Sequence, residues 1–151
     1  MNLALTTLLA VLGYLLTVGV ISPLLKYENK KTEIGIKLNY FSHIITSPGS
    51  AMKLADEAQK VIRTLAMELE AYYLGIQFKS LFIYLRAIPT RNNIAEVRRS
   101  LVFLSNSVHQ GDNENNCIEL GKVFAKLGIN EVNIDNSIVK SMKIYSKQGN
   151  L

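Results

Sequence analysis

The side chains best suited to chemistry are few in this sequence and lie far apart. The two histidines are His43 and His109, and Cys117 is the single cysteine. One cysteine excludes an intramolecular disulfide framework and any multi-cysteine zinc or iron–sulfur cage. Cys117 stands near a predicted helix N-terminus, but a nucleophile also needs a base, for which the sequence gives no evidence. We therefore expect an incidental Cys117 and a solvated His109.

The carboxylates and glycines form no catalytic or phosphate-binding pattern either. Asp56 and Glu57 are adjacent, and Glu68 and Glu70 are two apart, so on a helix neither pair points at a common atom. The patterns GxxxxGK[ST], GxGxxG, GxSxG and HExxH, paired CxxC motifs and the EF-hand loop are all absent. The sequence predicts no catalytic, cofactor-binding or metal-binding residue and identifies no small-molecule ligand.

The basic charge of the chain makes nucleic acid a partner to consider. The net charge is +5 and the pI is about 9.3. The strongest candidates for phosphate contacts are Arg98, Arg99 and the lysines near the C-terminus. However, the excess charge is modest, and the loop between the helices predicted at 94–107 and 117–127 is too long for a compact helix-turn-helix. We expect no specific nucleic-acid partner.

The opening segment carries the strongest signal in the sequence. All 29 charged side chains, 17 basic and 12 acidic, lie after residue 25, and residues 3–25 form an uncharged apolar run. As a helix this run is about 35 Å long, enough to cross a hydrocarbon core of about 30 Å. It predicts a transmembrane anchor over residues 1–25. The alternatives are a cleavable signal, disfavoured because no Lys or Arg precedes the long run, and a buried core helix.

The charges that follow this run predict its orientation. Four lysines come directly after it: Lys26, Lys30, Lys31 and Lys37. Because basic residues next to a span stay in the cytoplasm, the N-terminus is expected outside and the rest of the chain inside. A reduced cytoplasmic compartment also suits a lone thiol. We therefore predict a single-pass membrane protein with a cytoplasmic C-terminal domain.

Small residues recur along one face of the predicted span. They are spaced by 4, 3 and 4 positions: Thr6, Ala10, Gly13 and Thr17. Small side chains let a second membrane helix approach closely, and threonine hydroxyls can hydrogen-bond across such a contact. The face predicts self-association or pairing with another membrane subunit, with a chance distribution of small residues as the alternative.

The remainder of the chain is typical of a helical bundle. We predict a basic juxtamembrane connector at 26–50, a helical domain at 51–147 and a frayed tail at 148–151. Ser47–Ser50 breaks the chain before a long amphipathic helix from Ala51 toward Ala87, and helices follow at 94–107 and 117–127. We expect Asn92 or Asn93 to cap the first of these two helices, Asn116 to cap the second and Gly128 to end it. The fold class is therefore mainly α: one N-terminal transmembrane helix followed by a compact cytoplasmic helical bundle.

Residues 71–88 are apolar on nearly every side of the predicted helix. Five of the chain's 12 aromatic residues lie here: Tyr72, Tyr73, Phe78, Phe82 and Tyr84. A helix that is apolar all round is buried, or it contacts lipid or a partner. We expect a central core helix, with a protein interface or a membrane-surface contact as alternatives; the five aromatics are the candidate partner surface.

The C-terminal segment is expected to be a basic amphipathic helix. Its lysines are Lys140, Lys143 and Lys147. An anionic membrane surface would attract these and the juxtamembrane lysines, although a packed helix with exposed lysines is the simpler interpretation.

Three functions remain open from the sequence. We favour a non-enzymatic membrane-anchored interaction, scaffold or sensing subunit with a protein partner or a homo-oligomeric state. The alternatives are an oligomeric membrane-perturbing effector, such as a small toxin or defence protein, and a membrane-tethered enzyme that uses Cys117 or His109.

Overall fold

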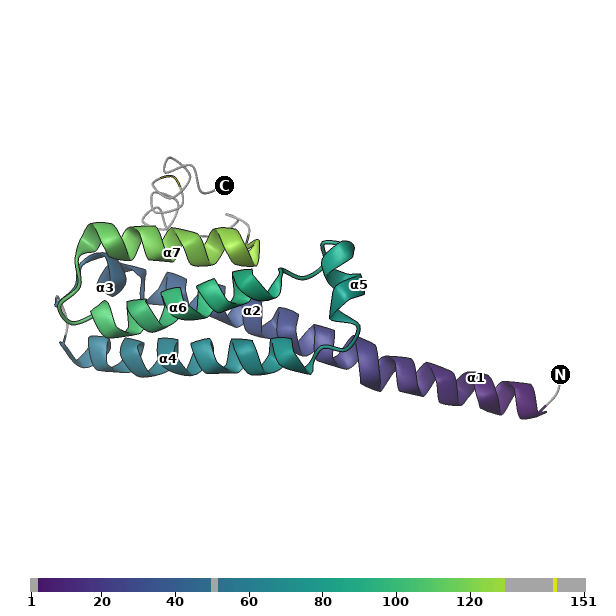
Figure 1. Ribbon diagram of the computed structural model, residues 1–151. Coiled ribbons are helices and arrows are strands. Elements are labelled where there is room, and N and C mark those ends of the chain that lie inside the picture. The colour runs from purple at the N-terminus through teal and green to yellow at the C-terminus, as the bar shows by residue number, and fades with distance from the viewer. Residues whose placement is uncertain (1–2, 50–51, 130–142, 144–151) are drawn as a thin grey trace.

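A computed structural model describes residues 3–49, 52–129 and 143 of the chain (Figure 1). The described residues are mainly helical and contain no strand. One long apolar N-terminal helix leads into a bundle of antiparallel helices, which confirms the predicted fold class.

The N-terminal helix runs without interruption through three elements, α1 (Leu3–Leu16), the π-helical turn η1 (Thr17–Ile21) and α2 (Ser22–Tyr40). The π turn immediately precedes Pro23, whose ring clashes with the carbonyl four residues earlier in a regular α-helix. Here the Ser22 N–H donates to the Thr17 carbonyl oxygen, five residues back. The wider turn accommodates the proline, so the helix continues instead of breaking.

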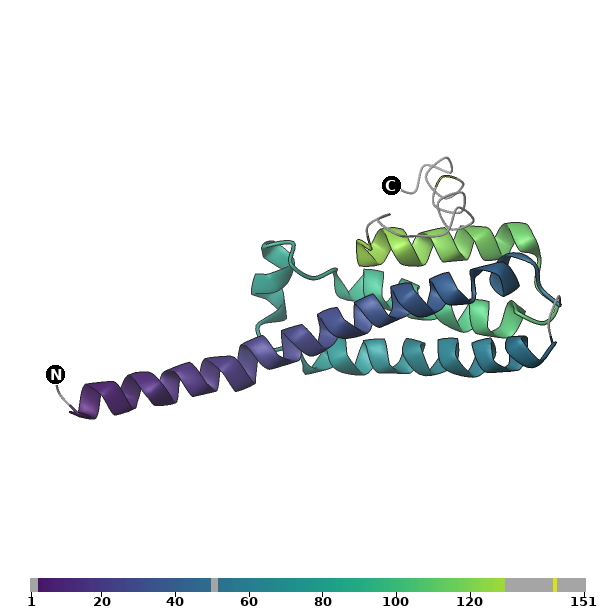
Figure 2. The same cartoon turned by 180° about the vertical axis from the view of Figure 1, so that it is seen from behind.

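The bundle is formed by α2, α4 (Met52–Gly75), α6 (Arg91–Ser107) and α7 (Asn113–Leu127). These helices alternate in direction, and α4 packs against both α2 and α6, while α6 packs against α7 (Figures 1 and 2). The short α3 (Ser42–Thr46) lies at the end far from α1 and contacts α7. The short α5 (Lys79–Tyr84) lies at the opposite end, where α1 leaves the bundle.

Local chemistry explains where the later helices begin and end. The Thr90 side chain caps α6 by accepting from the Asn93 N–H, so the prediction that Asn92 or Asn93 caps this helix is wrong. Asp112 caps α7 by accepting from the Glu114 N–H. Gly128 ends α7 as predicted. Its φ of 62° is in the left-handed region, which glycine adopts without steric cost.

Residues 26–46 contribute directly to the core of the bundle. The side chains that they bury are spaced along one face of α2 and continue into α3: Tyr27, Ile34, Leu38, Phe41, Ile44 and Ile45. Gly35 is buried too, because a Cβ there would lie 3.3 Å from the Ile129 side chain. The domain division at residue 50 stays a prediction, but this segment packs against α4 and α7.

The expected helix from Ala51 toward Ala87 is wrong in its second half. Helix α4 ends at Gly75, and the chain turns through Phe78, which has a left-handed φ of 53°. The Lys79 ammonium donates to the Leu74 carbonyl oxygen at 2.9 Å and satisfies one of the open acceptors at the end of α4. Residues 79–84 then form a separate helix whose residues are not buried, so a central core helix over 71–88 is also wrong.

Candidate membrane-facing surface

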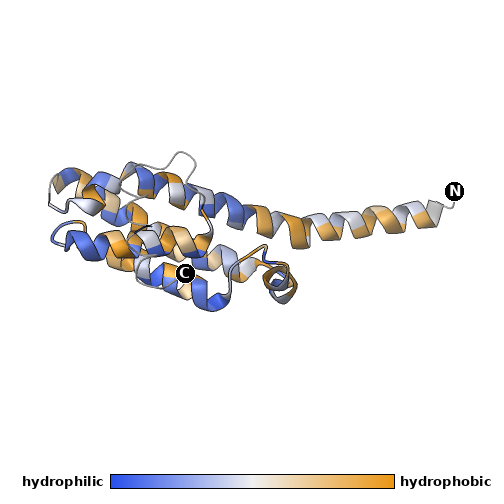
Figure 3. Ribbon diagram, turned by 90° about the horizontal axis from the view of Figure 1, so that it is seen from above, coloured by the Kyte–Doolittle hydropathy of each residue, from blue (hydrophilic) through white to orange (hydrophobic). Residues whose placement is uncertain are grey.

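The first half of the N-terminal helix is fully open to its surroundings. Within the part of the chain that the structure describes, one helix is long and apolar enough to cross a membrane, and it runs over Leu5–Tyr40. None of the residues in its most apolar stretch is buried against the rest of the protein. Figure 3 shows the apolar colouring along α1 giving way to hydrophilic residues on α2. This pattern excludes the alternative of a buried core helix for α1.

The four small residues of the predicted packing face all lie exposed on α1 and η1. A Cβ at Gly13 would meet nothing within 4 Å, so this face is open to the approach of another helix. The Thr17 hydroxyl donates to the Gly13 carbonyl oxygen at 2.9 Å. Its proton is therefore used within its own helix, and only the hydroxyl oxygen remains to accept from a partner.

The boundary between the exposed and the packed parts of the helix lies at Tyr27. The Tyr27 ring is fully buried and meets the Tyr73 ring edge-on, with 6.1 Å between centroids. The Tyr73 hydroxyl donates to the Pro89 carbonyl oxygen at 3.2 Å. Burial raises the pKa of Tyr27 above its usual value, and the charge of Glu28 adds to this effect.

The predicted membrane-surface lysines differ in their exposure and in their pairing with carboxylates. Lys26 is exposed, whereas Lys31 pairs with Glu28 at 3.1 Å, and Lys37 is half-buried. Lys143 is exposed, and Lys140 and Lys147 lie outside the described residues.

Lys30 is almost enclosed by acidic and aromatic groups. Its side chain is 12% exposed, and its ammonium pairs with Glu33 and, at 2.8 Å, with Glu68 of α4. The ammonium also lies 5.6 Å from the centroid of the Tyr72 ring. Burial acts to lower the pKa of Lys30, but the hydrogen bonds and charges of Glu33 and Glu68 outweigh it and raise the pKa. This charge is held inside the protein and links α2 to α4.

The five aromatic residues of the predicted partner surface separate into two groups. Tyr73 is buried in the core, so its assignment to a surface is wrong; it lies on the inner face of α4, opposite Tyr27. Tyr72 is partly exposed beside Lys30, and Phe82 packs partly against the core. Phe78 and Tyr84 are strongly exposed. The most exposed aromatics of this set are therefore on α5 and in the turn before it.

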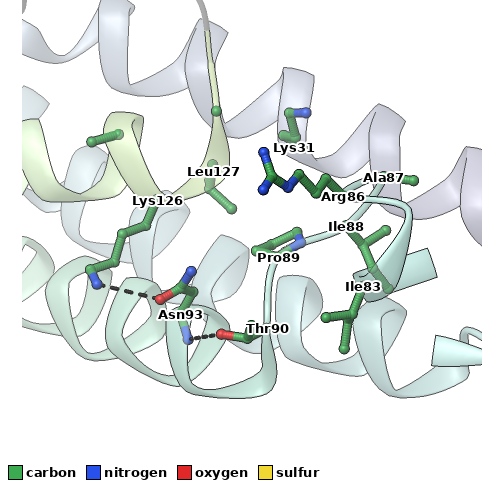
Figure 4. Close-up of a pocket in the computed structure, with 12 residues that line it drawn as sticks. Lys31, Ile83, Arg86, Ala87, Ile88, Pro89, Thr90, Asn93, Lys126 and Leu127 are labelled. Atoms are coloured by element: carbon green, nitrogen blue, oxygen red, sulfur yellow. Dashed lines mark hydrogen bonds between the residues drawn. The ribbon is translucent and has the colours of Figure 1, made fainter. Parts of the chain in front are cut away.

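A basic pocket of about 410 Å³ opens between α2, α5, α6 and α7 (Figure 4). Three cationic side chains line it: Lys31, Arg86 and Lys126. Lys126 pairs with Glu96 at 2.6 Å, and the hydrogen bond from Lys126 lowers the pKa of Glu96. The C-terminal end of α7 also lines the pocket, and its carbonyl groups carry partial negative charge. Lys31 and Lys126 are each paired with a carboxylate, and the negative end of α7 lines the same cavity, so the pocket is poorly suited to holding an anion.

The residues considered for catalysis or metal binding do not meet at one site, and His109 and Cys117 each contact a different neighbour. His109 Nε2 lies 3.4 Å from Asp56 Oδ1, and the Cys117 thiol donates to Asn113 Oδ1 at 3.3 Å. His43 is exposed on α3. In the described ranges no three His, Cys, Asp or Glu side chains are placed to share a metal ion.

Two features of this surface were missed by sequence reasoning. The first is the burial of α2, for which the spacing of 7, 4 and 3 from Tyr27 through Ile34 and Leu38 to Phe41 was an available signal. The second is the separation of α5 from α4, for which Gly75 was the only sequence signal.

Comparison of the chain with protein families, with curated proteins and with solved structures finds no match.

Proposed function

We propose that this chain is a single-pass membrane-anchored interaction protein, in which residues 5–25 cross the bilayer and the helical bundle binds a protein partner. The observation that carries this proposal is the division of one continuous helix. Its first half is uncharged and exposed on every side, and its second half is charged on one face and buried on the other.

The exposed half is suited to lipid and poorly suited to water. Large apolar side chains cover it, each about half exposed or more: Leu5, Leu8, Leu9, Leu12, Leu15 and Leu16. Exposed apolar surfaces of this size on soluble proteins mark an interface or cause aggregation. In hydrocarbon the same surface is solvated, and the helix satisfies its own backbone groups.

The orientation that we propose places the bundle in the cytoplasm. Four lysines follow the span within residues 26–37, and none lies in residues 1–25. Lys26 and Lys31 lie within the first turns after the span, where the positive-inside effect is strongest.

A role in binding, and not in catalysis, is supported by how the reactive side chains are used. The Cys117 thiol and the His109 imidazole each meet one neighbour on the bundle. Large apolar side chains such as Leu8 on α1 and Leu81 on α5 are by contrast more than half exposed.

Anchoring and orientation are tested together in membranes from expressing cells. The full chain should remain in the pellet after high-speed sedimentation and an alkaline wash, and detergent should release it. A reporter that is active only in the cytoplasm, fused after Leu151, should be active. A soluble intact chain would contradict the anchor, and a silent reporter on a well-expressed fusion would reverse the orientation.

The partner is tested by purification in mild detergent followed by mass spectrometry. A stoichiometric second protein, or a defined oligomer of this chain, supports the interaction role. Gly13→Ile should reduce any association that runs through the span, because it places a bulky side chain at the one glycine of the small-residue face. Leu8→Ile, exposed on the opposite side of the helix, is the matched control.

The open small-residue face also favours a second candidate, a membrane-perturbing effector whose spans assemble. Expression with a membrane-potential dye separates the two. Loss of potential that Gly13→Ile abolishes supports the effector, and cells that stay polarised support the anchored interaction protein.

A further inference from the structure

The exposed face of α5 is the second apolar surface of the molecule. Four large side chains project from this helix and its flanks: Phe78, Leu81, Tyr84 and Leu85, of which Phe78 is 65% and Tyr84 84% exposed. No other described part of the protein covers these side chains at this end of the bundle. Helix α5 runs across the long axis of the molecule at the point where α1 emerges (Figures 1 and 3).

The opposite face of this segment holds it firmly to the bundle. Ile76 before α5 and Ile88 after it are buried, and Phe82 and Ile83 pack partly against the core. The Phe82 carbonyl oxygen accepts from the Ala87 N–H at 2.9 Å, which closes the turn after the helix. The segment is thus anchored at both ends and amphipathic, with its apolar outer face maintained by the fold.

The turn before α5 lies beside the uncharged helix and not beside the charged one. A Cβ at Gly19 would lie 3.5 Å from Gln77 Oε1. Gln77 and Phe78 share an apolar groove of about 390 Å³ with residues between Leu12 and Val20. Gly19 precedes the first charged residue, Lys26, by seven positions, about 10 Å along the helix axis. A bilayer that surrounds the uncharged helix therefore reaches the level of this turn.

We propose that α5 and the turn before it insert into the interface of the same bilayer that α1 crosses, on the side of Lys26. This inference rests on the proposed membrane anchor. With α1 along the membrane normal, α5 lies in the membrane plane, as interfacial amphipathic helices do. Tyr84 is of a type enriched at such interfaces, and the exposed Phe78 and Leu81 suit the apolar face of an interfacial helix.

The position of the patch favours lipid over a protein partner. It is continuous with the exposed face of the span and faces the same end of the molecule. A stable protein interface buries about 800 Å² on each partner, more than four partly packed side chains of this size provide. With two attachments, the bundle is held against the membrane in one orientation instead of swinging on a single helix.

A tryptophan introduced at one position at a time tests the insertion, because the chain contains none of its own. The full chain carrying Phe78→Trp is reconstituted into phosphatidylcholine–phosphatidylglycerol vesicles whose acyl chains are brominated to quench nearby tryptophan. Leu12→Trp in the span is the positive control. Met52→Trp, exposed at the start of α4 and at the far end of the bundle, is the negative control.

We expect Phe78→Trp to be quenched to an extent approaching that of Leu12→Trp, while Met52→Trp keeps its intensity. Adding Tyr84→Ser and Leu81→Ser to Phe78→Trp should reduce the quenching. Tyr84→Trp gives an independent reading, should the substitution at the left-handed Phe78 disturb the turn.

The other outcomes separate this inference from the proposed anchor. If Leu12→Trp is quenched and both α5 probes behave like Met52→Trp, α5 is in water and the inference is overturned while the anchor stands. If the α5 probes are shielded from aqueous iodide but unaffected by bromine, a protein surface covers them, which also overturns it. If Leu12→Trp itself is not quenched, the anchor has failed.

Discussion

The two halves of the N-terminal helix form one rod with two different surroundings. Residues 5–18 expose every side chain, whereas Tyr27, Ile34 and Leu38 on the second half are completely buried against the bundle. The backbone is helical throughout, so the difference lies wholly in the side chains. The second half is amphipathic because it has the core on one side and solvent on the other. The first half has no charged face, and the proposed lipid surroundings would require none, because lipid is the same on all sides. The comparison shows that the apolar content of a helix does not by itself distinguish a core from a membrane span; the placement of charges does.

The largest effect is expected on membrane association, from introducing charged side chains into the exposed half of the helix. Leu8→Lys combined with Leu12→Lys places two ammonium groups in the span, at a cost of about 3 kcal/mol each near the centre of a bilayer. The double variant should move from the membrane pellet to the soluble or aggregated fraction. Met67→Lys, on an exposed position of α4, should stay in the pellet. A double variant that still resists an alkaline wash would show that α1 does not lie in hydrocarbon.

Shortening a leucine in each half sharpens the contrast. Leu38→Ala removes a fully buried side chain and should lower the free energy of unfolding by about 2–5 kcal/mol. Leu12→Ala should leave the unfolding of the bundle unchanged, because Leu12 makes no core contact. Urea titration in detergent, followed by circular dichroism, measures both. Equal losses in the free energy of unfolding for the two variants would mean that Leu12 and Leu38 contribute to the bundle in the same way.

The sequence was sufficient where local spacing decides burial. Ile94, Val97 and Leu101 face the core of α6 as their spacing of 3 and 4 predicts, and Gly128 ends α7. The sequence was insufficient where the role of a side chain depends on a residue that is distant along the chain. Asn116 looked like a helix cap, yet it is buried and donates to the Ile45 carbonyl oxygen, 71 positions away.

The membrane-facing surface was predictable to a similar, limited extent. The long apolar helix that could cross a membrane follows from the absence of charge alone, because this property depends on length and composition and not on the rest of the fold. The composition of residues 71–88 indicated burial or contact, but the choice depends on where α4 stops. Ile76 and Ile88 are drawn into the core and leave α5 outside it, which is a tertiary decision that no local pattern encodes.

The tyrosine pair at the start of the buried half is expected to give an intermediate effect. Tyr73→Phe removes the hydrogen bond to the Pro89 carbonyl oxygen and should cost about 1 kcal/mol. The buried Tyr27 hydroxyl has no hydrogen-bond partner among the described residues. Tyr27→Phe should therefore be neutral or stabilising by about 0.5 kcal/mol. The opposite ranking in urea titrations would contradict this geometry.

The same pair predicts a dependence on alkaline pH. Burial raises the pKa of Tyr27 and of Tyr73 above the usual value of 10.0. Above that value the unfolded chain releases protons that the folded protein retains, so the free energy of unfolding falls as the pH rises. The contribution of the two protonated tyrosines to the free energy of unfolding is fully present below pH 10. Tyr27→Phe should make this alkaline loss shallower, and an unchanged slope would mean that Tyr27 is accessible to water.

The smallest effect is expected from the ion pairs that join the two environments. Glu68→Gln removes the partner of Lys30 on α4, and Glu33→Gln removes its partner on α2 itself. Both glutamates are partly exposed, so each change should cost about 0.5 kcal/mol or less, and more salt should reduce it. Glu68→Gln should cost more than Glu33→Gln because only the former link connects two helices.

A double-mutant cycle with Lys30→Met isolates this link. The coupling between Lys30 and Glu68 should vanish at high salt, while the coupling of Tyr27 with Tyr73 should persist, since the tyrosine contact is apolar and the ion pair is screened. If both couplings resist salt, the Lys30 ammonium is shielded from ions more completely than its 12% exposure indicates. That result would mean that the pair belongs to the interior of the bundle and stabilises the contact between α2 and α4 as the tyrosine pair does.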